Sequence, residues 1–288
     1  MLLITGGSGF VGQNLARFFA PRRKTVTTYH TQPLPNSLGP SLQLDVTDAD
    51  ATFSTLEREH PEVVIHAAGN KNVKFCEQYP EAAHRVNGIG TQNVARACQR
   101  IGATLIYIST DLVFSCAEGN YREDDVPQPT LAYGRSKLAG ERFALEACDQ
   151  VAICRSGGIY GRRSPLLKWF TDEIATGKTV ECFTDIFNTP TYVDNLAEMF
   201  EAILEKELLG YFHVVGSERV SRYQFFREYG TVFDLDVNLI APVEAPKDDE
   251  SLLLQTDSSL ASDASAKKIG VHFDSVSEGF KRLELDTD

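Results

Sequence analysis

The sequence lacks any long apolar run. No stretch approaches the ~18 or more apolar residues that a membrane-spanning helix needs, and only residues 1–4 are apolar before the first glycines begin. A run of that length is also too short for the apolar part of a secretory leader. We therefore expect neither a membrane span nor a signal peptide.

Basic residues are fewer than acidic residues. The 288 residues include 28 Lys and Arg against 40 Asp and Glu, a formal net charge of −12. Nucleic acids and anionic membranes both favour a basic face, so we expect neither as a partner. With 42% hydrophobic and 24% charged residues, the chain has the composition of a globular protein that buries a sizeable core.

Cysteine and histidine occur without the spacings of disulfide frameworks or metal sites. The six cysteines are scattered and form no C-x-x-C pair, and the six histidines show no ligand spacing. Free thiols in a chain of this size are typical of a reducing compartment. We predict a cytoplasmic protein without a metal site.

Short apolar runs alternate with helical patterns through the first half of the chain. Strands are predicted at residues 2–4, 25–29, 41–44, 63–65, 105–108 and 151–154, and helices at 10–20, 51–59, 81–101 and 133–147. Continuous apolar strands separated by helices indicate a parallel sheet covered on both faces. The predicted fold class is α/β, a Rossmann-type doubly wound parallel sheet.

A looser pattern follows residue 155. Helices are predicted at 165–176, 193–207 and 221–233, strands at 180–183 and 211–215, and a solvated acidic loop at 242–251. We therefore predict an NAD(P)-binding domain at residues 1–155 and a smaller C-terminal α/β substrate-binding lobe at 156–288. The boundary is approximate, because a chain that crosses between the lobes would blur it.

A glycine-rich turn lies between the first strand and the first helix. Residues 5–12 read T-G-G-S-G-F-V-G, which contains both G-x-G-x-x-G and T-G-x-x-G-x-x-G. Glycines permit a tight turn and close approach of the backbone, and the following helix offers free N–H groups to a pyrophosphate. This context favours a bound dinucleotide over a turn without a ligand.

The region after the second strand has no acidic residue. Dinucleotide folds usually place Asp or Glu there to bind the ribose 2′-hydroxyl, but residues 28–32 read T-Y-H-T-Q. Without that carboxylate a 2′-phosphate is not repelled, so NADP is favoured. No Arg follows to hold the phosphate, so NAD stays open.

A tyrosine and a lysine four residues apart form the second motif. Tyr133 and Lys137 share one face of a predicted helix, and a neighbouring ammonium lowers a phenol's pKa so that it exchanges protons near neutral pH. Ser109, Thr110 and Asp111 end a predicted strand at the sheet edge where ligands of open α/β sheets bind. Surface helices also carry such Tyr–Lys pairs, but the glycine turn on the same edge favours a functional site.

Taken together, these motifs resemble the extended short-chain dehydrogenases/reductases, and within them the dTDP-4-dehydrorhamnose reductase-like branch. The segments are residues 5–12, 45–46 (D-V), 66–69 (H-A-A-G), Asn87 with 90–91 (G-T), 109–114 (S-T-D-L-V-F), 133–141 (Y-G-R-S-K-L-A-G-E), 185–197, 210–216 (G-Y-F-H-V-V-G) and a late helix at 261–270. The resemblance covers most of the chain in order and spacing. It implies an NAD(P)-dependent reduction of a keto group on a sugar, and we expect that sugar to be nucleotide-linked.

The resemblance also implies roles for individual residues. Tyr133 is the expected general acid, Lys137 holds the nicotinamide ribose and keeps the Tyr pKa low, and Thr110 hydrogen-bonds the substrate carbonyl, with Ser109 as the alternative. The expected cofactor-binding residues are Gly6, Gly9, Phe10, Val11, Gly12, His30, Asp45, Val46, Ala67, Ala68, Gly69, Ser109, Tyr133 and Lys137. The expected substrate-binding residues are Lys71, Asp111, Arg155 and Arg163, the arginines because guanidinium suits bidentate phosphate contact.

Several positions depart from the rhamnose reductase pattern. Leu112, Gly158, Ile186 and Asn188 replace residues that face the sugar in that family, so a different sugar is expected. Leu112 also stands where dehydratases need a Glu, and a leucine moves no proton, which argues against dehydration. A nucleotide-sugar epimerase stays open as an alternative.

A second alternative belongs to another class. The regulatory subunit of methionine adenosyltransferase resembles the same branch, so a non-catalytic NADP-binding subunit is also open. The joint presence of Thr110, Tyr133 and Lys137 weighs against it. Family members are often dimers, which leaves a homodimer open as well.

Overall fold

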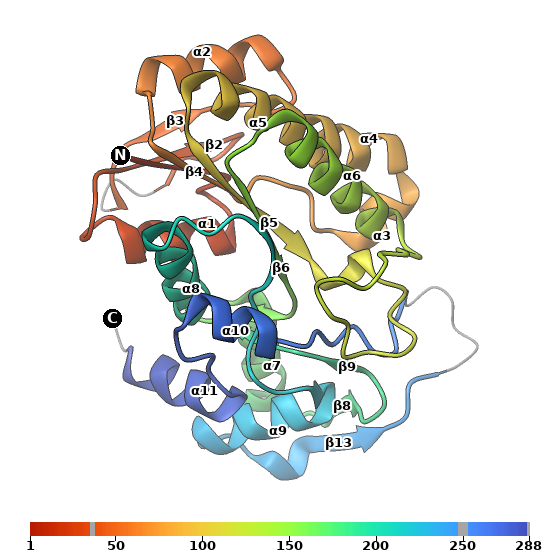
Figure 1. Cartoon of the computed structure of the whole chain (residues 1–288). Coiled ribbons are helices and arrows are strands. Elements are labelled where there is room, and N and C mark those ends of the chain that lie inside the picture. The colour runs from red at the N-terminus through yellow and green to blue at the C-terminus, as the bar shows by residue number, and fades with distance from the viewer. Residues whose placement is uncertain (35–37, 247–252, 287–288) are drawn as a thin grey trace.

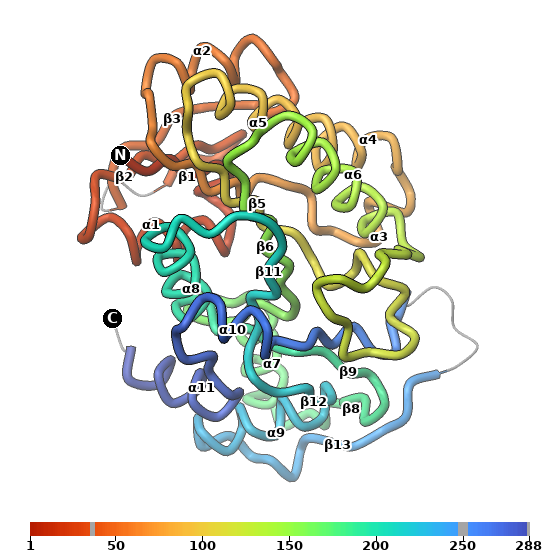
Figure 2. Tube along the Cα trace, in the orientation of Figure 1, coloured from red at the N-terminus to blue at the C-terminus, as the bar shows by residue number. Residues whose placement is uncertain are grey.

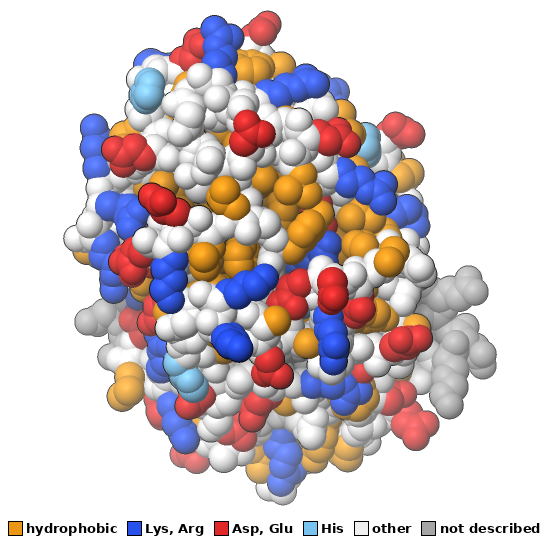
Figure 3. All heavy atoms as spheres, viewed as in Figure 1, with side chains coloured by type: hydrophobic (Ala, Val, Ile, Leu, Met, Phe, Trp, Pro, Cys, Tyr) orange, Lys and Arg blue, Asp and Glu red, His pale blue; other side chains and the backbone are white. Residues whose placement is uncertain are grey.

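A computed structural model describes residues 1–34, 38–246 and 253–286 of the chain. Its upper part in Figure 1 is a twisted sheet with helices on both sides, and its lower part holds shorter strands and helices. No helix in these ranges combines the length and apolar character that crossing a membrane requires. On the face in Figure 3, acidic and basic side chains are interspersed, with no continuous basic area.

The main sheet has seven strands in the order β11-β6-β5-β4-β1-β2-β3, all parallel. Every residue of the central strand β1 is buried, as expected for a parallel strand covered on both faces. The predicted Rossmann-type sheet is thereby confirmed. The strands are β1 (Leu2–Thr5), β2 (Thr25–Tyr29), β3 (Ser41–Gln43), β4 (Val63–His66), β5 (Thr104–Thr110), β6 (Val151–Ser156) and β11 (Gly210–His213).

Helices cover both faces of this sheet. On one face, α1 (Phe10–Phe19), α8 (Val193–Glu205) and α10 (Asp263–Ile269) bury side chains such as Phe19 and Phe200 against the strands. On the other, α2 (Ala49–Glu59), α5 (Gly90–Ile101) and α6 (Ala132–Ala147) bury Leu56, Val94 and Ala144. Figure 2 shows α8 beside α1, although the two lie far apart in sequence.

One predicted helix is interrupted. The sequence pattern predicts a continuous helix over 81–101, whereas the structure has α4 (Pro80–His84), one π-helical turn (Arg85–Ile89) and then α5. The short helix α3 (Val73–Gln78), which the pattern did not predict, precedes them. The π-helical turn carries Asn87, whose side chain contacts the functional site described below. Such turns are frequent at functional sites.

The second half of the chain forms a smaller aromatic core and also contributes to the main sheet. Its helices are α7 (Pro165–Ala175), α9 (Arg222–Val232) and α11 (Val276–Leu285), which pack Phe170, Phe226 and Phe280 together. Its two-stranded sheets pair β10 (Thr191–Tyr192) with β7 (Ile159–Tyr160), β12 (Val220–Ser221) with β9 (Phe187–Asn188), and β13 (Ile240–Val243) with β8 (Val180–Phe183). Strand β11 and helix α8 come from this half yet belong to the main sheet and its cover.

The acidic loop predicted at 242–251 starts differently from the prediction. Pro242 and Val243 belong to β13 and pair with Cys182 and Phe183 of β8. Strand β13 has four residues, one of them a proline, which sequence patterns associate with loops. The three consecutive acids of the predicted loop, residues 248–250, lie outside the described residues.

Candidate active site

A cavity of about 310 Å³ opens where β1, β4, β5 and β6 end at one edge of the main sheet. This edge is where open α/β sheets bind ligands. The cavity brings together residues predicted from separate motifs: Gly6, Gly9, Phe10, Val11, Gly12, Ala67, Gly69, Lys71, Ser109, Thr110, Asp111, Tyr133 and Lys137.

The glycine turn owes its shape to two close backbone approaches. Gly6 has φ +66°, and a Cβ there would lie 2.6 Å from the Cα of Ala68 in the loop after β4. A Cβ on Gly12 would lie 2.3 Å from the carbonyl oxygen of Gly6. Only glycine fits both positions. Helix α1 follows with no acidic residue in its first turn, so its free N–H groups favour an anion.

A second cavity, of about 700 Å³, continues from the first past the ends of β2 and β3. The two cavities share the lining residues Gly6, Gly9, Ala67, Gly69 and Lys71. The second is also lined by the predicted residues His30, Asp45, Val46 and Ala68, and by Tyr29 and Arg85, which sequence reasoning missed. A continuous path over a glycine turn and a helix N-terminus fits an extended dinucleotide.

Helix α6 brings Tyr133 to the cavity through a tight contact with the loop after β5. A Cβ on Gly134 would lie 2.0 Å from the carbonyl oxygen of Leu112, so glycine is required for this approach. The Tyr133 side chain is partly buried and lines the same cavity as Thr110. Burial and the nearby Asp111 carboxyl raise the pKa of Tyr133. The phenol therefore holds its proton near neutral pH, as a general acid must.

The ammonium of Lys137 is turned toward the sheet. It donates to the Ile108 carbonyl oxygen at 2.6 Å and lies over the Tyr107 ring, 4.1 Å from its centroid. Burial lowers the pKa of Lys137 to about 7. Burial and Asp111 set the direction of the shift at Tyr133, whose pKa is raised in this structure. That Lys137 lowers the pKa of Tyr133 stays a prediction.

Thr110 and Asp111 form a short hydrogen-bond chain with a residue from far along the sequence. Thr110 Oγ1 donates to Asp111 Oδ1 at 2.8 Å, and Ser258 Oγ donates to Asp111 Oδ2 at 2.7 Å. The backbone N–H of Leu112 donates to Thr110 Oγ1 at 3.3 Å. Burial raises the pKa of Asp111. No sequence motif pointed to Ser258.

Arg155 does not reach the cavities. It is 2% exposed and makes a bidentate pair with Glu141, from Nε to Oε1 at 3.0 Å and from Nη2 to Oε2 at 2.8 Å. Ser109 Oγ also donates to Glu141 Oε1, at 2.5 Å. The prediction that Arg155 binds substrate is thus wrong. Its guanidinium is paired with the Glu141 carboxylate beneath the site. The sequence pattern did not indicate this pairing.

The other predicted cations have different surroundings. Lys71 lines both cavities, with its Nζ 5.7 Å from the centroid of the Phe10 ring. Arg163 is exposed, has φ +59° and lines neither cavity. The structure therefore brings Lys71 to the site and leaves Arg163 outside it.

Asn87 connects three parts of the site. Its Nδ2 donates to Asn70 O at 3.0 Å and to Ser136 Oγ at 2.9 Å, and its Oδ1 accepts from the backbone N–H of Asn70 at 2.8 Å. The loop after β4 is thereby held against the helix that carries Tyr133. We assign Asn87 a structural role.

A third cavity, of about 370 Å³, lies beyond Asp111 and Leu112. Ile186, Asn188 and Gly158, three positions that depart from the rhamnose reductase pattern, line it together with Lys74 and Arg222. Gly158 also lines the first cavity, so the two adjoin. The departures thus line one cavity, and Gly158 connects it with the cavity that Tyr133 and Thr110 line.

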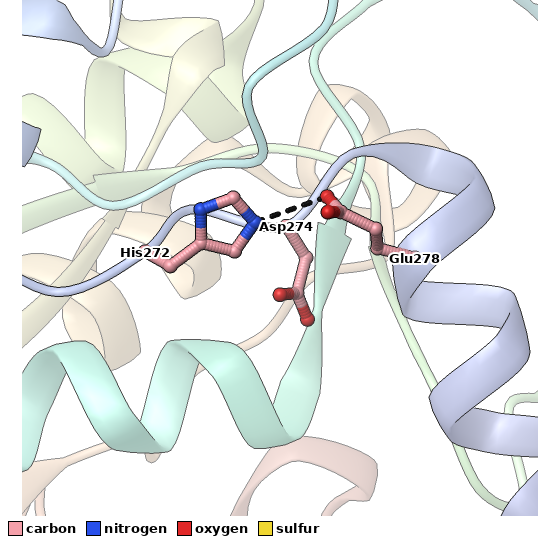
Figure 4. A group of neighbouring side chains, drawn as sticks. All are labelled: His272, Asp274 and Glu278. Atoms are coloured by element: carbon pink, nitrogen blue, oxygen red, sulfur yellow. Dashed lines mark hydrogen bonds and ion pairs between the residues drawn. The ribbon is translucent and has the colours of Figure 1, made fainter.

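Three side chains of the types that bind metal ions lie close together outside this site. Ligand atoms of His272, Asp274 and Glu278 lie within 4.8 Å of one another, and Figure 4 shows His272 directed at Glu278. The His272 Nε2 and Glu278 Oε2 are 3.1 Å apart, and Arg282 donates to Asp274 at 2.7 Å. Since Arg282 already supplies a cation to Asp274, these contacts explain the group without a metal ion.

Comparison with known proteins shows similarity over the whole length. Residues 1–284 match the family model described as the RmlD substrate binding domain. A probable low-salt glycan biosynthesis reductase, Agl14, of Haloferax volcanii is 32% identical over 82% of this chain and 81% of its own length. The dTDP-4-dehydrorhamnose reductase of Mycolicibacterium smegmatis is 31% identical over 84% of this chain and 72% of its own.

A solved structure is similar to this chain over nearly its whole length. The dTDP-4-dehydrorhamnose reductase of Bacillus anthracis in complex with NADP superimposes with a TM-score of 0.87 and 26% identity, covering 99% of each chain.

Proposed function

Because the chain belongs to the RmlD substrate binding domain family, we propose that it is an NAD(P)-dependent reductase of a keto group on a nucleotide-linked sugar, of the dTDP-4-dehydrorhamnose reductase type. The observation that carries the proposal is the convergence of Tyr133, Thr110 and Lys137 on one cavity beside the glycine turn. Three groups from α6 and the end of β5 meet where the nicotinamide ring of a bound dinucleotide would lie.

The bound cofactor supplies a hydride to the carbonyl carbon, and the chain supplies the proton. Tyr133 transfers its phenolic proton to the carbonyl oxygen as the C=O bond becomes a secondary alcohol, and the phenolate later regains a proton from solvent. The raised pKa of the phenol keeps that proton in place before the step. Thr110, which lines the same cavity as Tyr133, positions the substrate oxygen.

Lys137, the glycine turn and the second cavity bind successive parts of the cofactor in this proposal. Lys137 faces the cavity from the same helix as Tyr133 and holds the nicotinamide ribose. The N-terminus of α1 receives the pyrophosphate, and the cavity lined by His30, Asp45 and Val46 receives the adenosine. Lys71 and Asp111 are the residues that we assign to the sugar side.

The direct test is NADPH oxidation by the purified protein. We expect absorbance at the nicotinamide band to fall when dTDP-4-dehydrorhamnose or a related 4-keto nucleotide sugar is added, with one alcohol formed per NADPH consumed. Related sugars belong in the panel because the departures at Gly158, Ile186 and Asn188 line the adjoining cavity. No turnover of any such sugar would contradict the proposal.

The same preparation separates the proposal from an epimerase. An epimerase keeps its cofactor through the catalytic cycle, whereas a reductase releases oxidised cofactor after each turnover. We expect freshly purified protein to lack a stoichiometric nicotinamide absorbance. Product analysis should show a reduced sugar and no interconversion of hydroxyl epimers without net NADPH consumption.

We also propose a preference for NADPH over NADH and predict that His30→Asp reverses it. His30 lies at the end of β2, its side chain 69% exposed and 3.7 Å from Asp45, so the substitution should not disturb the core. A new carboxylate there would repel a 2′-phosphate, and we expect the Kd for NADPH to rise about tenfold or more while the Kd for NADH changes little. Fluorescence titration measures both constants.

The matched control is His30→Asn, which removes the imidazole without adding charge. It should weaken NADPH binding much less than His30→Asp. Equal weakening of both cofactors by His30→Asp would show that His30 does not face the 2′-position.

A further inference from the structure

The hydroxyl of Thr110 has a single proton, and the Asp111 carboxyl lies where it accepts that proton in a hydrogen bond. Thr110 Oγ1 donates to Asp111 Oδ1 at 2.8 Å and accepts from the Leu112 N–H at 3.3 Å. An ionised carboxylate only accepts hydrogen bonds. When Asp111 is ionised, it therefore accepts the hydrogen bond from the Thr110 hydroxyl. Thr110 then has no proton left to donate to a substrate oxygen.

A neutral Asp111 reverses this arrangement. Its own proton, carried on Oδ1, is then donated to Thr110 Oγ1, and the hydroxyl proton of Thr110 is free to point into the cavity. Ser258 can donate to Asp111 Oδ2 whether Asp111 is ionised or neutral, because this oxygen has a free lone pair in both forms. Thr110, Asp111 and Ser258 thus form a hydrogen-bond chain from the sugar side of the site to a loop near the C-terminus. The direction of the hydrogen bond between Thr110 and Asp111 depends on whether Asp111 is protonated.

We propose that Asp111 is a positioning residue whose carboxyl proton, held between Thr110 and Ser258, decides whether Thr110 can donate a hydrogen bond to the substrate oxygen. This inference rests on the proposed reductase function. The neutral carboxyl is the productive form, since only then do both Thr110 and Tyr133 present protons to the carbonyl oxygen that becomes an alcohol.

The surroundings of Asp111 favour the neutral form. The carboxyl is 6% exposed, and among the described residues it makes no ion pair. Burial raises its pKa, against the hydrogen bonds from Ser258 and Thr110, which lower it.

The titratable and charged groups that face Asp111 come from several elements. Tyr133 of α6 and Cys116 of the loop after β5 are close enough to feel its charge, and burial and Asp111 raise the pKa of each. Lys137 faces it within the first cavity, and Lys74 of α3 and Arg222 of α9 face it across the third. A bound substrate would lie between Asp111 and the last two cations and remove water from the carboxyl.

The test compares pH profiles of NADPH-dependent reduction in the wild type, Asp111→Asn and Ser258→Ala. Asparagine copies the neutral acid, since its amide donates to Thr110 and its carbonyl accepts from Ser258. We expect wild-type kcat to fall at least tenfold as Asp111 ionises, and the pH profile of Asp111→Asn to lack that step. The contribution of Lys137, whose pKa lies about 7, is common to both proteins and cancels in the comparison.

Ser258→Ala should shift the pH at which kcat falls to a higher value, whereas a general loss of structure would lower kcat. The Ser258 hydrogen bond lowers the pKa of Asp111, so its removal should move the fall in kcat to higher pH. Carbon-13 NMR of the Asp111 carboxyl in the NADP complex, assigned by its absence in Asp111→Asn, should show the same pKa as the wild-type step. Asp172→Asn, on the surface of α7 and paired with Lys168, should keep the wild-type profile.

Two results would overturn the inference alone: full wild-type activity at a pH where NMR shows Asp111 ionised, or a profile of Asp111→Asn that matches the wild type. A folded, NADPH-binding Asp111→Asn without activity at any pH would also do so, because it would show that the ionised carboxylate is needed. Failure of the proposed function looks different: the wild type itself would turn over no keto sugar at any pH.

Discussion

Tyr133→Phe is expected to lose turnover by about 10²- to 10⁴-fold, the usual contribution of a positioned general acid. Tyr133 lines the same cavity as Thr110, and desolvation together with Asp111 raises the pKa of its phenol, so the hydroxyl carries the proton that the substrate oxygen needs. Phenylalanine keeps the ring that packs near Cys76, Ala83 and Ala132. The fold and NADPH binding should therefore remain nearly unchanged. Steady-state reduction of the keto sugar measures the loss, and NADPH fluorescence titration measures the binding.

Tyr223→Phe is the matched control for this substitution. Tyr223 lies on α9, where its hydroxyl accepts from Arg227 on an exposed helix face, outside the three cavities of the site. Removing that hydroxyl should leave kcat within about twofold. Undiminished turnover in Tyr133→Phe, with the control also active, would remove Tyr133 from the role of acid.

Arg155→Met is expected to destabilise the protein by about 3–5 kcal/mol, the usual consequence of removing one partner of a buried ion pair. Glu141 is fully buried, and the substitution takes away the guanidinium that satisfies both of its carboxylate oxygens. Only the hydrogen bond from Ser109 would remain. The shift of the urea midpoint at constant m-value measures the loss.

Two further variants identify the cause of that loss. The double variant with Glu141→Leu and Arg155→Met removes both charges and should recover most of the stability, because no unpaired carboxylate is left in the core. Lys168→Met removes a cation from an exposed pair with Asp172 and should change stability by less than about 1 kcal/mol. If Arg155→Met is no more damaging than Lys168→Met, the pair does not hold the structure together.

The local sequence pattern was sufficient to predict most of the main sheet. Strands β1, β4, β5 and β6 are short apolar runs and β2 is rich in β-branched residues. A chain in which such strands alternate with helices has few alternatives to a parallel sheet with both faces covered. The two-stranded pairs such as β9 with β12 were not predictable in this way. Each strand has two residues, too few for any periodicity to appear.

Within the site, the sequence predicted the residues that belong to compact motifs. The glycine turn, the Tyr133–Lys137 pair and the hydroxyls at the end of β5 each occupy a few consecutive positions, and the rule that parallel strands end at one edge was enough to expect them together. Whether each residue has its proposed role stays a prediction for the variants above to test.

What the sequence alone determined is therefore the alternation of strand and helix and the grouping of short motifs at one sheet edge, because both follow from local periodicity and chain direction. Only the tertiary structure decided that Arg155 is paired with Glu141 beneath the site, that Lys137 turns toward Tyr107, and that Ser258 contacts Asp111 across 147 positions of the chain. These choices depend on which side chains share a buried space once the layers have packed. A buried charge or hydroxyl takes the partner that lies within hydrogen-bond reach there, wherever that partner stands in the sequence.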